Sequence, residues 1–358
     1  MIKAVYIHIP FCDHICSYCD FPKILSETNY QKEYLNSLKK EIETNYRNEI
    51  IETIYIGGGT PSSLSLTDLK YLLDILTVFK TRNLEYTMEV NIESIDKDKL
   101  KLMKKYGINR ISIGIETFND KYLKFLNRNY TKKDIKPKIE LIKKYFSNIN
   151  VDLMYAFPNQ TIKELEEDID AFLDLNINHI STYSLIIEPN TVLYNKNTEN
   201  IDEDLDYKMY ELITNKLSKY HHYEISNFAK TGFESKHNLV YWHNENYYGF
   251  GLGAAGYIDN IRYTNTRSIN NYFKGNYILD KHKLDKKETM SNEFMLGLRL
   301  IDGIDITTFK DKYKMDIKNY KNIKELLELD KLKIENNRLF INPKYIYISN
   351  SILVDLIW

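Results

Sequence analysis

The chain has 358 residues, of which 43% are hydrophobic, so it is long and apolar enough to bury the core of one large and one smaller domain. Its 49 basic and 50 acidic residues leave a net charge of −1, which argues against a general nucleic-acid-binding surface. No segment reaches the ~18 consecutive apolar residues of a membrane span, and residues 1–8 lack the apolar stretch of a secretory signal. We therefore expect a cytoplasmic protein, either free or peripheral at a membrane.

Short apolar strands alternate with amphipathic helices over the first half of the chain. Strands are predicted over residues 4–9, 53–56, 85–90, 110–114, 149–155 and 179–187. Helices are predicted over residues 30–46, 67–79, 96–106, 120–126, 132–145 and 162–175, with Ser65 capping the second and a capping box of Thr161 and Glu164 at the last. Six βα units predict an α/β fold, either a doubly wound parallel sheet or a partial barrel open on one side. In both, the chemistry lies at the carboxyl ends of the strands.

The regular alternation of predicted strands and helices ends after residue 204. A helix is predicted over residues 205–220, and the aromatic stretch 241–272 is expected to be irregular. The lysine-rich segment 281–287 predicts a domain boundary. Beyond it we expect helices over 288–300 and 323–329, a hairpin of 332–335 and 338–341 turning at Asn336-Asn337, and a last helix ending at Leu356. This pattern is typical of a winged-helix-like α+β module, which we interpret as a packing or partner element because the charge is near neutral.

Three cysteines, and no others, lie within one eight-residue window: Cys12, Cys16 and Cys19. An odd number of closely spaced thiols does not form a disulfide framework, and it favours a soft metal ligand set. A 4Fe–4S cluster held by three thiolates would keep one iron open for a small molecule. The alternative is a zinc site, with His14 or a distant histidine as the fourth ligand.

Two glycine-rich segments and one aromatic string also suggest sites. The run Gly57-Gly58-Gly59-Thr60-Pro61 follows a predicted strand and lets a ligand approach the backbone, although a tight turn explains it equally well. The string Gly251-Leu252-Gly253-Ala254-Ala255-Gly256 lacks the βαβ context of a dinucleotide site, so we interpret it as close backbone packing. His237-Asn238-Leu239-Val240-Tyr241-Trp242 predicts either a heme-ligating histidine beside flat aromatic rings or a buried aromatic cluster.

Together these motifs resemble the radical S-adenosylmethionine (SAM) family, in the branch of oxygen-independent coproporphyrinogen III oxidase and its paralogue, the heme chaperone HemW. The resemblance rests on Tyr6-x-His8-x-Pro10-Phe11-Cys12-x3-Cys16-x2-Cys19, on the triple glycine, and on Asn109-Arg110-Ile111-Ser112-Ile113-Gly114. It implies a partial (β/α)6 barrel over residues 1–230, an extension carrying the HNxxYW string over 231–280, and a small C-terminal HemN-type domain over 281–358.

The resemblance also implies ligands for individual residues. Cys12, Cys16 and Cys19 would hold the cluster, and its open iron would bind SAM. The implied SAM-binding positions are Tyr6, Tyr18, Gly58, Gly59, Thr60, Glu89, Glu116, Arg128 and Asp152. His237 would bind heme. The chain departs from the family pattern at Glu116, where Gln is usual, at Tyr155-Ala156-Phe157-Pro158, which replaces Gly-Leu-Pro, and at Ala255, where His is frequent.

Two features separate the paralogues. The cysteine pattern of the oxidases is C-x3-C-x2-C-x-C, whereas this chain has Phe21 at the position of the last cysteine. The chain also begins at the first strand, without the amino-terminal arm of the oxidases. The chaperones carry the HNxxYW string that is complete here. We therefore expect a heme chaperone that delivers heme to a respiratory hemoprotein, with no nucleic-acid partner and no catalytic residue that the sequence identifies. A coproporphyrinogen III oxidase and a zinc-dependent binding module are the alternatives.

Overall fold

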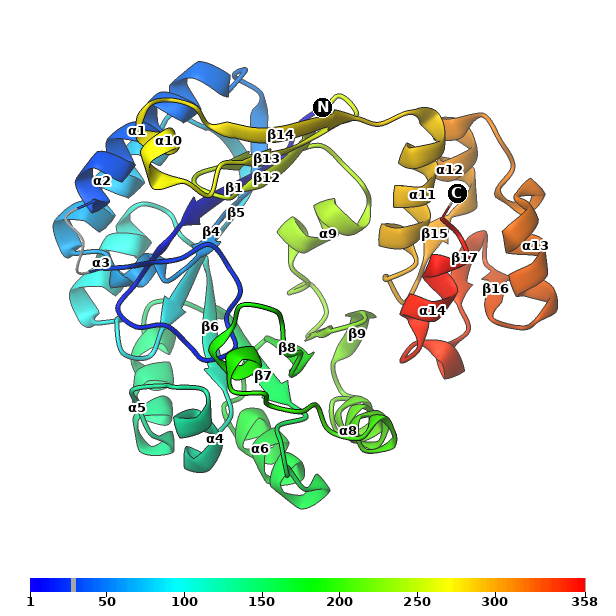
Figure 1. Ribbon diagram of the computed structural model, residues 1–358, viewed down its shortest axis with the longest axis horizontal. Helices are drawn as coiled ribbons and strands as arrows, with labels where there is room; N and C mark the ends of the chain where they lie inside the picture. Colours follow the sequence, from blue (N-terminus) through cyan, green and yellow to red (C-terminus); the bar gives the residue numbers. More distant parts are fainter. Residues whose placement is uncertain (27–29, 358) are drawn as a thin grey trace.

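The computed structural model describes residues 1–26 and 30–357, and Trp358, the last residue of the predicted C-terminal domain, lies outside them. At its centre is a run of adjacent parallel strands whose side chains are largely buried (Figure 1). In spatial order they are β1 (Ala4–Ile9), β4 (Ile50–Gly58), β5 (Lys80–Asn91), β6 (Arg110–Glu116), β7 (Asn148–Tyr155) and β8 (His179–Ser184). The predicted α/β fold with six parallel strands is therefore confirmed.

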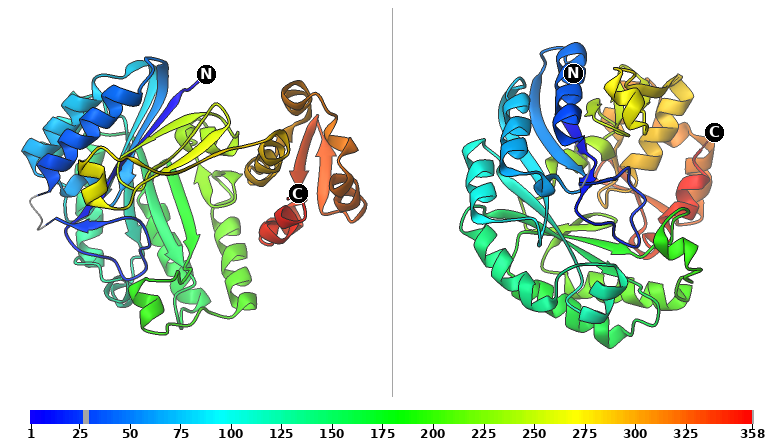
Figure 2. Two further views of the ribbon diagram at one scale, coloured as in Figure 1. Left: turned by 45° about the horizontal axis from the view of Figure 1, so that its top comes forward. Right: turned by 60° about the vertical axis from the view of Figure 1, so that its left-hand side comes forward.

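Six helices cover the outer side of this curved sheet (Figure 2, right). They are α1 (Gln31–Asn45), α2 (Leu66–Leu76), α3 (Lys97–Lys105), α4 (Asp120–Phe125), α5 (Lys132–Lys143) and α6 (Ile162–Asp174). The side chain of Ser65 caps α2, and Thr161 with Glu164 forms the capping box of α6, both as predicted. The sheet does not close, because β14 and β9 form its two edges within the described residues.

The aromatic stretch after residue 241 is not irregular, contrary to our prediction. It contains β11 (Tyr247–Phe250), which pairs in parallel with β1, followed by the antiparallel strands β12 (Ala255–Ile258) and β13 (Ile261–Asn265) and by α10 (Ile269–Phe273). Aromatic residues favour strands, and Asp259 and Asn260, with φ of 52° and 62°, make the two-residue turn that joins β12 to β13.

Both ends of the sheet carry antiparallel strands that the sequence did not reveal. At one end, β14 (Ile278–Lys283) follows β13, so the lysine-rich segment proposed as a boundary begins inside a strand. At the other end, β10 (Asn227–Ala229) and β9 (His221–Glu224) follow β8. The helix α8 (Glu203–Lys216) precedes β9, and the predicted strand over 179–187 ends earlier, at Ser184.

The C-terminal module, residues 286–357, has its own apolar cluster around Phe294, Phe309 and Leu339. Its elements are α11 (Lys286–Gly297), β15 (Ile304–Asp305), α12 (Ile306–Tyr313), α13 (Lys321–Glu328), β16 (Leu332–Glu335), β17 (Arg338–Ile341) and α14 (Ser349–Val354). The predicted hairpin turns at Asn336 and Asn337, with φ of 48° and 64°. The sequence did not predict β15 and α12, which complete the winged-helix-like arrangement.

One helix packs against both the sheet and the C-terminal module. The helix α9 (Lys236–Trp242) carries the HNxxYW string and lies between the sheet and α11 (Figure 1). Among the described residues, no helix is both long and apolar enough to cross a membrane.

Candidate functional site

A cavity at the carboxyl ends of β1 and β4 to β7 brings together most of the predicted site residues. It is lined by Cys12, Cys16, Tyr18, Cys19, Gly58, Gly59, Thr60, Glu89, Glu116, Arg128 and Asp152. Tyr6 and His237 do not line it. The strands place these side chains together because the carboxyl ends of parallel strands meet at one edge of the sheet.

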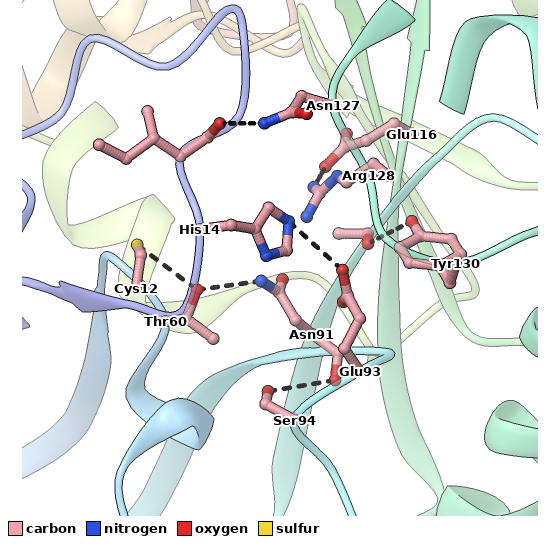
Figure 3. A network of polar contacts seen from close by, with 12 residues as sticks. Cys12, His14, Thr60, Asn91, Glu93, Ser94, Glu116, Asn127, Arg128 and Tyr130 are labelled. Atoms are coloured by element: carbon pink, nitrogen blue, oxygen red, sulfur yellow. Dashed lines mark hydrogen bonds and ion pairs between the residues drawn. The ribbon is translucent and has the colours of Figure 1, made fainter. Parts of the chain in front are cut away.

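The cysteine loop, residues 10–22, is held by contacts that involve no thiol. Within the loop, β2 (Phe11–Cys12) pairs in parallel with β3 (Ile24–Leu25), which follows the loop in the chain. The imidazole of His8 donates from Nε2 to the carbonyl of Pro22 at 2.9 Å, which leaves Nδ1 to accept from the Tyr6 hydroxyl at 3.0 Å. In Figure 3, the Asn127 amide reaches the carbonyl of Ile15 at 2.8 Å. These contacts fix the loop at its base and at its tip.

The three thiols are free and differ in their surroundings. Cys12 is buried, Thr60 Oγ1 lies 3.7 Å from its sulfur, and burial raises the pKa of the Cys12 thiol to about 11. Burial also raises the pKa of Cys16. A bound cation would lower the pKa of a coordinating thiol and hold it as the thiolate.

The three thiols can serve a 4Fe–4S cluster without converging on one point. Within residues 1–26 and 30–357, no group of three or more His, Cys, Asp or Glu side chains is arranged to hold one metal ion. A 4Fe–4S cluster places each thiolate on a different iron, so its ligands need not converge on one point. His14, the predicted alternative zinc ligand, points to Glu93 instead, with 3.5 Å between Nε2 and Oε1 (Figure 3).

The triple glycine lets β4 approach the cysteine loop closely. A Cβ on Gly59 would lie 2.9 Å from the Cys12 sulfur, and one on Gly58, whose φ is +117°, would lie 2.6 Å from the His8 ring. A Cβ on Gly57 would lie 2.8 Å from the carboxylate of Glu89. These distances are too short for any side chain, so glycine is required here for close packing as well as for ligand access.

The carboxylates of Glu89 and Asp152 are buried at the carboxyl ends of the parallel strands. Glu89 accepts hydrogen bonds from the Tyr55 hydroxyl at 2.8 Å and from the Gly58 amide at 3.0 Å, and burial raises its pKa. Asp152 accepts from the Asn150 amide at 2.9 Å. Burial, together with the negative charge of Glu116, raises the pKa of Asp152 to about 7. The cavity therefore offers carboxylate acceptors to a hydroxyl or cationic ligand.

Glu116, the departure from the usual Gln, is paired with a buried cation. Its carboxylate forms an ion pair with Arg128 (Figure 3). It also accepts from the Tyr18 hydroxyl at 2.9 Å. Arg128 also donates to the same hydroxyl at 3.1 Å. The negative charge that Glu116 adds is therefore compensated within the site itself. Glu116 adopts a left-handed backbone conformation, with φ of 69°, at the end of β6.

Sequence reasoning missed two polar residues beside the cavity. Asn91 lines it and donates to Thr60 Oγ1 at 2.9 Å, and Glu93 faces His14. Both follow the strand predicted over 85–90, at the edge where the chemistry was expected, so their position after that strand could have identified them.

His237 lies in the protein interior, with 1% of its surface exposed. Its Nδ1 lies 2.8 Å from Thr53 Oγ1 and its Nε2 lies 2.7 Å from the Tyr241 hydroxyl. Burial lowers the pKa of His237 to about 3, so the ring is neutral. An iron atom would have to displace Thr53 or Tyr241 to bind this imidazole.

The later glycine-rich string packs against the cysteine loop, which confirms our interpretation. A Cβ on Gly251 would lie 2.5 Å from the carbonyl of His8, and one on Gly253 would lie 2.5 Å from the ring of Pro22. Both glycines have positive φ, of 105° and 71°. Ala255, the position of a frequent His, is exposed on β12 and does not line the cavity.

Comparison with known proteins agrees with these features. Residues 6–172 match the model of the Radical SAM superfamily, and residues 284–346 match that of the HemN C-terminal domain. The chain is 42% identical to the heme chaperone HemW of Bacillus subtilis over 87% of each chain. It is 38% identical to the heme chaperone HemW of Lactococcus lactis, over 98% of this chain and 96% of the relative.

A solved structure resembles the whole fold. The coproporphyrinogen III oxidase HemN of Escherichia coli superposes with a TM-score of 0.86, covering 99% of this chain and 90% of its own. The two sequences are 18% identical, so this likeness establishes the radical SAM fold and not the activity.

Proposed function

The chain belongs to the HemW family of heme chaperones within the radical SAM superfamily, and we propose that it binds heme and delivers it to a respiratory hemoprotein. The observation that carries this proposal is the similarity to HemW proteins over almost the whole chain, at 38% identity across 98% of it.

We also propose that the cavity holds a 4Fe–4S cluster and SAM. The three cysteines are the only thiols in the chain, and they line one cavity together with backbone glycines and Arg128. When bound, a cluster with one open iron supplies a coordination site for the amino and carboxylate groups of SAM and a source of single electrons. The charged side chains that line the cavity and could orient the remainder of the SAM molecule are Lys23, Glu89, Asp152 and the paired Glu116 and Arg128.

Phe21 argues against the oxidase alternative. Phe21 lines the cavity, and 60% of its surface is exposed. It occupies the position at which the cysteine pattern of the oxidases has a fourth cysteine. A phenyl ring offers neither a metal ligand nor a hydrogen-bond donor to a porphyrinogen carboxylate.

The test offers two tetrapyrroles, heme and coproporphyrinogen, to one preparation of the protein. The protein is reconstituted anaerobically with iron and sulfide, and cluster absorption is recorded. It is then titrated with heme and, separately, incubated with coproporphyrinogen, SAM and dithionite. We expect cluster absorption, a heme Soret band that saturates, and no protoporphyrinogen. The triple cysteine-to-serine variant is the matched control for the cluster.

Each alternative has its own signature in this test. Protoporphyrinogen formation would replace the chaperone proposal by the oxidase. Stoichiometric zinc without cluster absorption would indicate the zinc-dependent module. Failure of the protein to bind heme would refute the chaperone function directly.

A further inference from the structure

The first turn of α9 packs against the inner side of the sheet, opposite the six outer helices (Figure 1). The backbone amides of Lys236 and His237 donate to the carboxylate of Glu85 on β5, at 3.1 and 3.0 Å. The imidazole of His237 is held by Thr53 of β4 and by the Tyr241 hydroxyl, at 2.8 and 2.7 Å. The histidine of the HNxxYW string is therefore fixed through its backbone and through both ring nitrogens.

The ring of His237 stacks on Tyr55 of β4, with 5.2 Å between the ring centroids and 30° between the planes. Thr53 and Tyr55 are two residues apart on one strand, so their side chains point to the same face of the sheet, and His237 contacts both. Tyr6 pairs with Tyr55 across β1 and β4 and stacks on the same ring, with 6.2 Å between centroids. Two neighbouring rings therefore limit the movement of Tyr55.

The hydroxyl of Tyr55 in turn holds the carboxylate of Glu89, which lines the cavity of the cysteine loop. Tyr55 donates to Glu89 Oε1 at 2.8 Å, and the Gly58 amide donates to Oε2 at 3.0 Å. Over residues 1–26 and 30–357 this carboxylate accepts no further hydrogen bond. One donor on each oxygen fixes the orientation of the carboxylate plane, and loss of the Tyr55 hydroxyl would leave the plane free to turn about the remaining bond.

The titratable and charged groups that face Glu89 come from five elements: Tyr6 on β1, Tyr55 on β4, Arg110 on β6, Asp152 on β7 and Tyr241 on α9. Burial raises the pKa of Glu89, whereas the bonds from Tyr55 and Gly58 and the charge of Arg110 oppose that rise. The Tyr55 hydroxyl therefore favours the ionised form of Glu89 as well as its orientation.

We propose that Tyr55 is a positioning residue for SAM, which holds the Glu89 carboxylate in the orientation that binds the cofactor, and that His237 of the HNxxYW string holds Tyr55 in place. The inference rests on the proposed binding of SAM and deepens it, because it gives the histidine of the string a role in support of that cavity. Neither Tyr55 nor His237 lines the cavity, so both act through Glu89 and not by touching SAM.

The experiment measures the affinity of the reconstituted protein for SAM by equilibrium dialysis, at equal cluster content and at several pH values. Tyr55→Phe removes the hydroxyl and keeps the ring. Tyr248→Phe is the matched control, because Tyr248 on β11 also donates to a glutamate, Glu49, at 2.8 Å, and neither residue lines the cavity. His237→Ala and the double variant Tyr55→Phe/His237→Ala test whether the histidine acts through the tyrosine.

We expect Tyr55→Phe to weaken SAM affinity about tenfold near pH 7, the effect of one hydrogen bond to a charged group. The loss should shrink as the pH rises from about 7 to about 9, because Glu89 without its tyrosine donor ionises at higher pH than in the parent protein. Altered packing alone would weaken binding by the same factor at every pH. Tyr248→Phe should keep the affinity of the parent protein.

The double variant tests the second half of the proposal. His237→Ala should weaken SAM affinity by a smaller factor than Tyr55→Phe, since the hydroxyl is still present but less well held. Adding His237→Ala to Tyr55→Phe should cause no further loss, because the bond through which the histidine acts is already absent. If the two losses multiply instead, His237 does not act through Tyr55.

The outcomes separate this inference from the function on which it rests. If the parent protein binds SAM and Tyr55→Phe binds it equally well, or with a loss that is constant with pH, the positioning role is wrong and the proposed SAM binding stands. If the parent protein binds no SAM, the proposed cofactor is wrong and the inference fails with it. The heme titration described above tests the chaperone function independently of both.

Discussion

Glu41, a carboxylate buried within α1, should make the protein less stable as pH rises. It is 2% exposed and accepts hydrogen bonds from the Gly251 amide at 2.9 Å, the Tyr272 hydroxyl at 2.6 Å and the Asn265 amide at 2.6 Å. These bonds favour the carboxylate, but the loss of hydration outweighs them and raises the pKa of Glu41 from 4.5 to about 7.

The sign of the effect follows from proton binding. Between pH 4.5 and about 7 the folded protein keeps a proton on Glu41 that the unfolded chain has released. Stability therefore falls with rising pH across this window, and the full effect is about 3 kcal/mol at ~1.4 kcal/mol per pKa unit. Between pH 5 and pH 8, which avoids acid unfolding, about 2–3 kcal/mol of it should be observed.

The assay is urea unfolding of the parent protein and of Glu41→Gln at pH 5 and pH 8. Glutamine cannot ionise, so its variant should lose this part of the pH dependence, and the difference in unfolding free energy between the two proteins should change by about 2–3 kcal/mol. Because the other buried acids are the same in both proteins, their contributions cancel when the two unfolding free energies are subtracted. Glu43→Gln is the matched control, since Glu43 is exposed on the same helix. Equal pH profiles for the parent protein and Glu41→Gln would refute the reasoning.

Three further outcomes follow from the contacts described above. The triple cysteine-to-serine variant should lose cluster absorption but keep its far-ultraviolet circular dichroism, because the loop is anchored without the thiols; aggregation would contradict this. Gly249→Ala should lower the free energy of unfolding, measured with urea, by about 3 kcal/mol or more, since its Cβ would lie 1.8 Å from the carbonyl of Ala255, and an unchanged free energy would show that β12 can shift. Lys314→Gly should stabilise the protein by ~0.5–1 kcal/mol in the same assay, because Lys314 ends α12 at a φ of 53°, and destabilisation would point to an unrecognised role for its side chain.

The sequence predicted the six βα units because each strand and helix has a clear hydrophobic period. The strand pattern also placed the chemistry at the carboxyl ends of the strands, where the cavity lies, whereas most of the individual lining residues were named by the family resemblance. Asn91 shows that this rule was applied too narrowly, because it too ends a strand at that edge.

The sequence could not predict contacts between distant segments. β11 pairs with β1 across more than half of the chain, and no local period shows where such a strand will add to a sheet. The pairing of Glu116 with Arg128 was equally hidden, because the two residues lie on different elements and only the fold brings their charges together. The sequence alone showed only that Glu116 stands where the family usually has Gln.

The HNxxYW string shows why a motif does not by itself say which of its residues touches a ligand. His237 and Tyr241 are four residues apart on α9, so they share one helical face and bond to each other. That face turns inward: His237 stacks on Tyr55 with 5.2 Å between ring centroids, and Tyr55 donates to Glu89 in the cavity of the cysteine loop. Trp242 and the C-cap residue His243 lie at the other end of α9 and line a second cavity, between this helix and the C-terminal module. One short helix thus reaches Glu89 of the first cavity through Tyr55 and lines the second cavity directly. A substitution at His237 is therefore expected to disturb Glu89 first, and any effect it has on heme must be separated from that disturbance before the histidine is called a ligand.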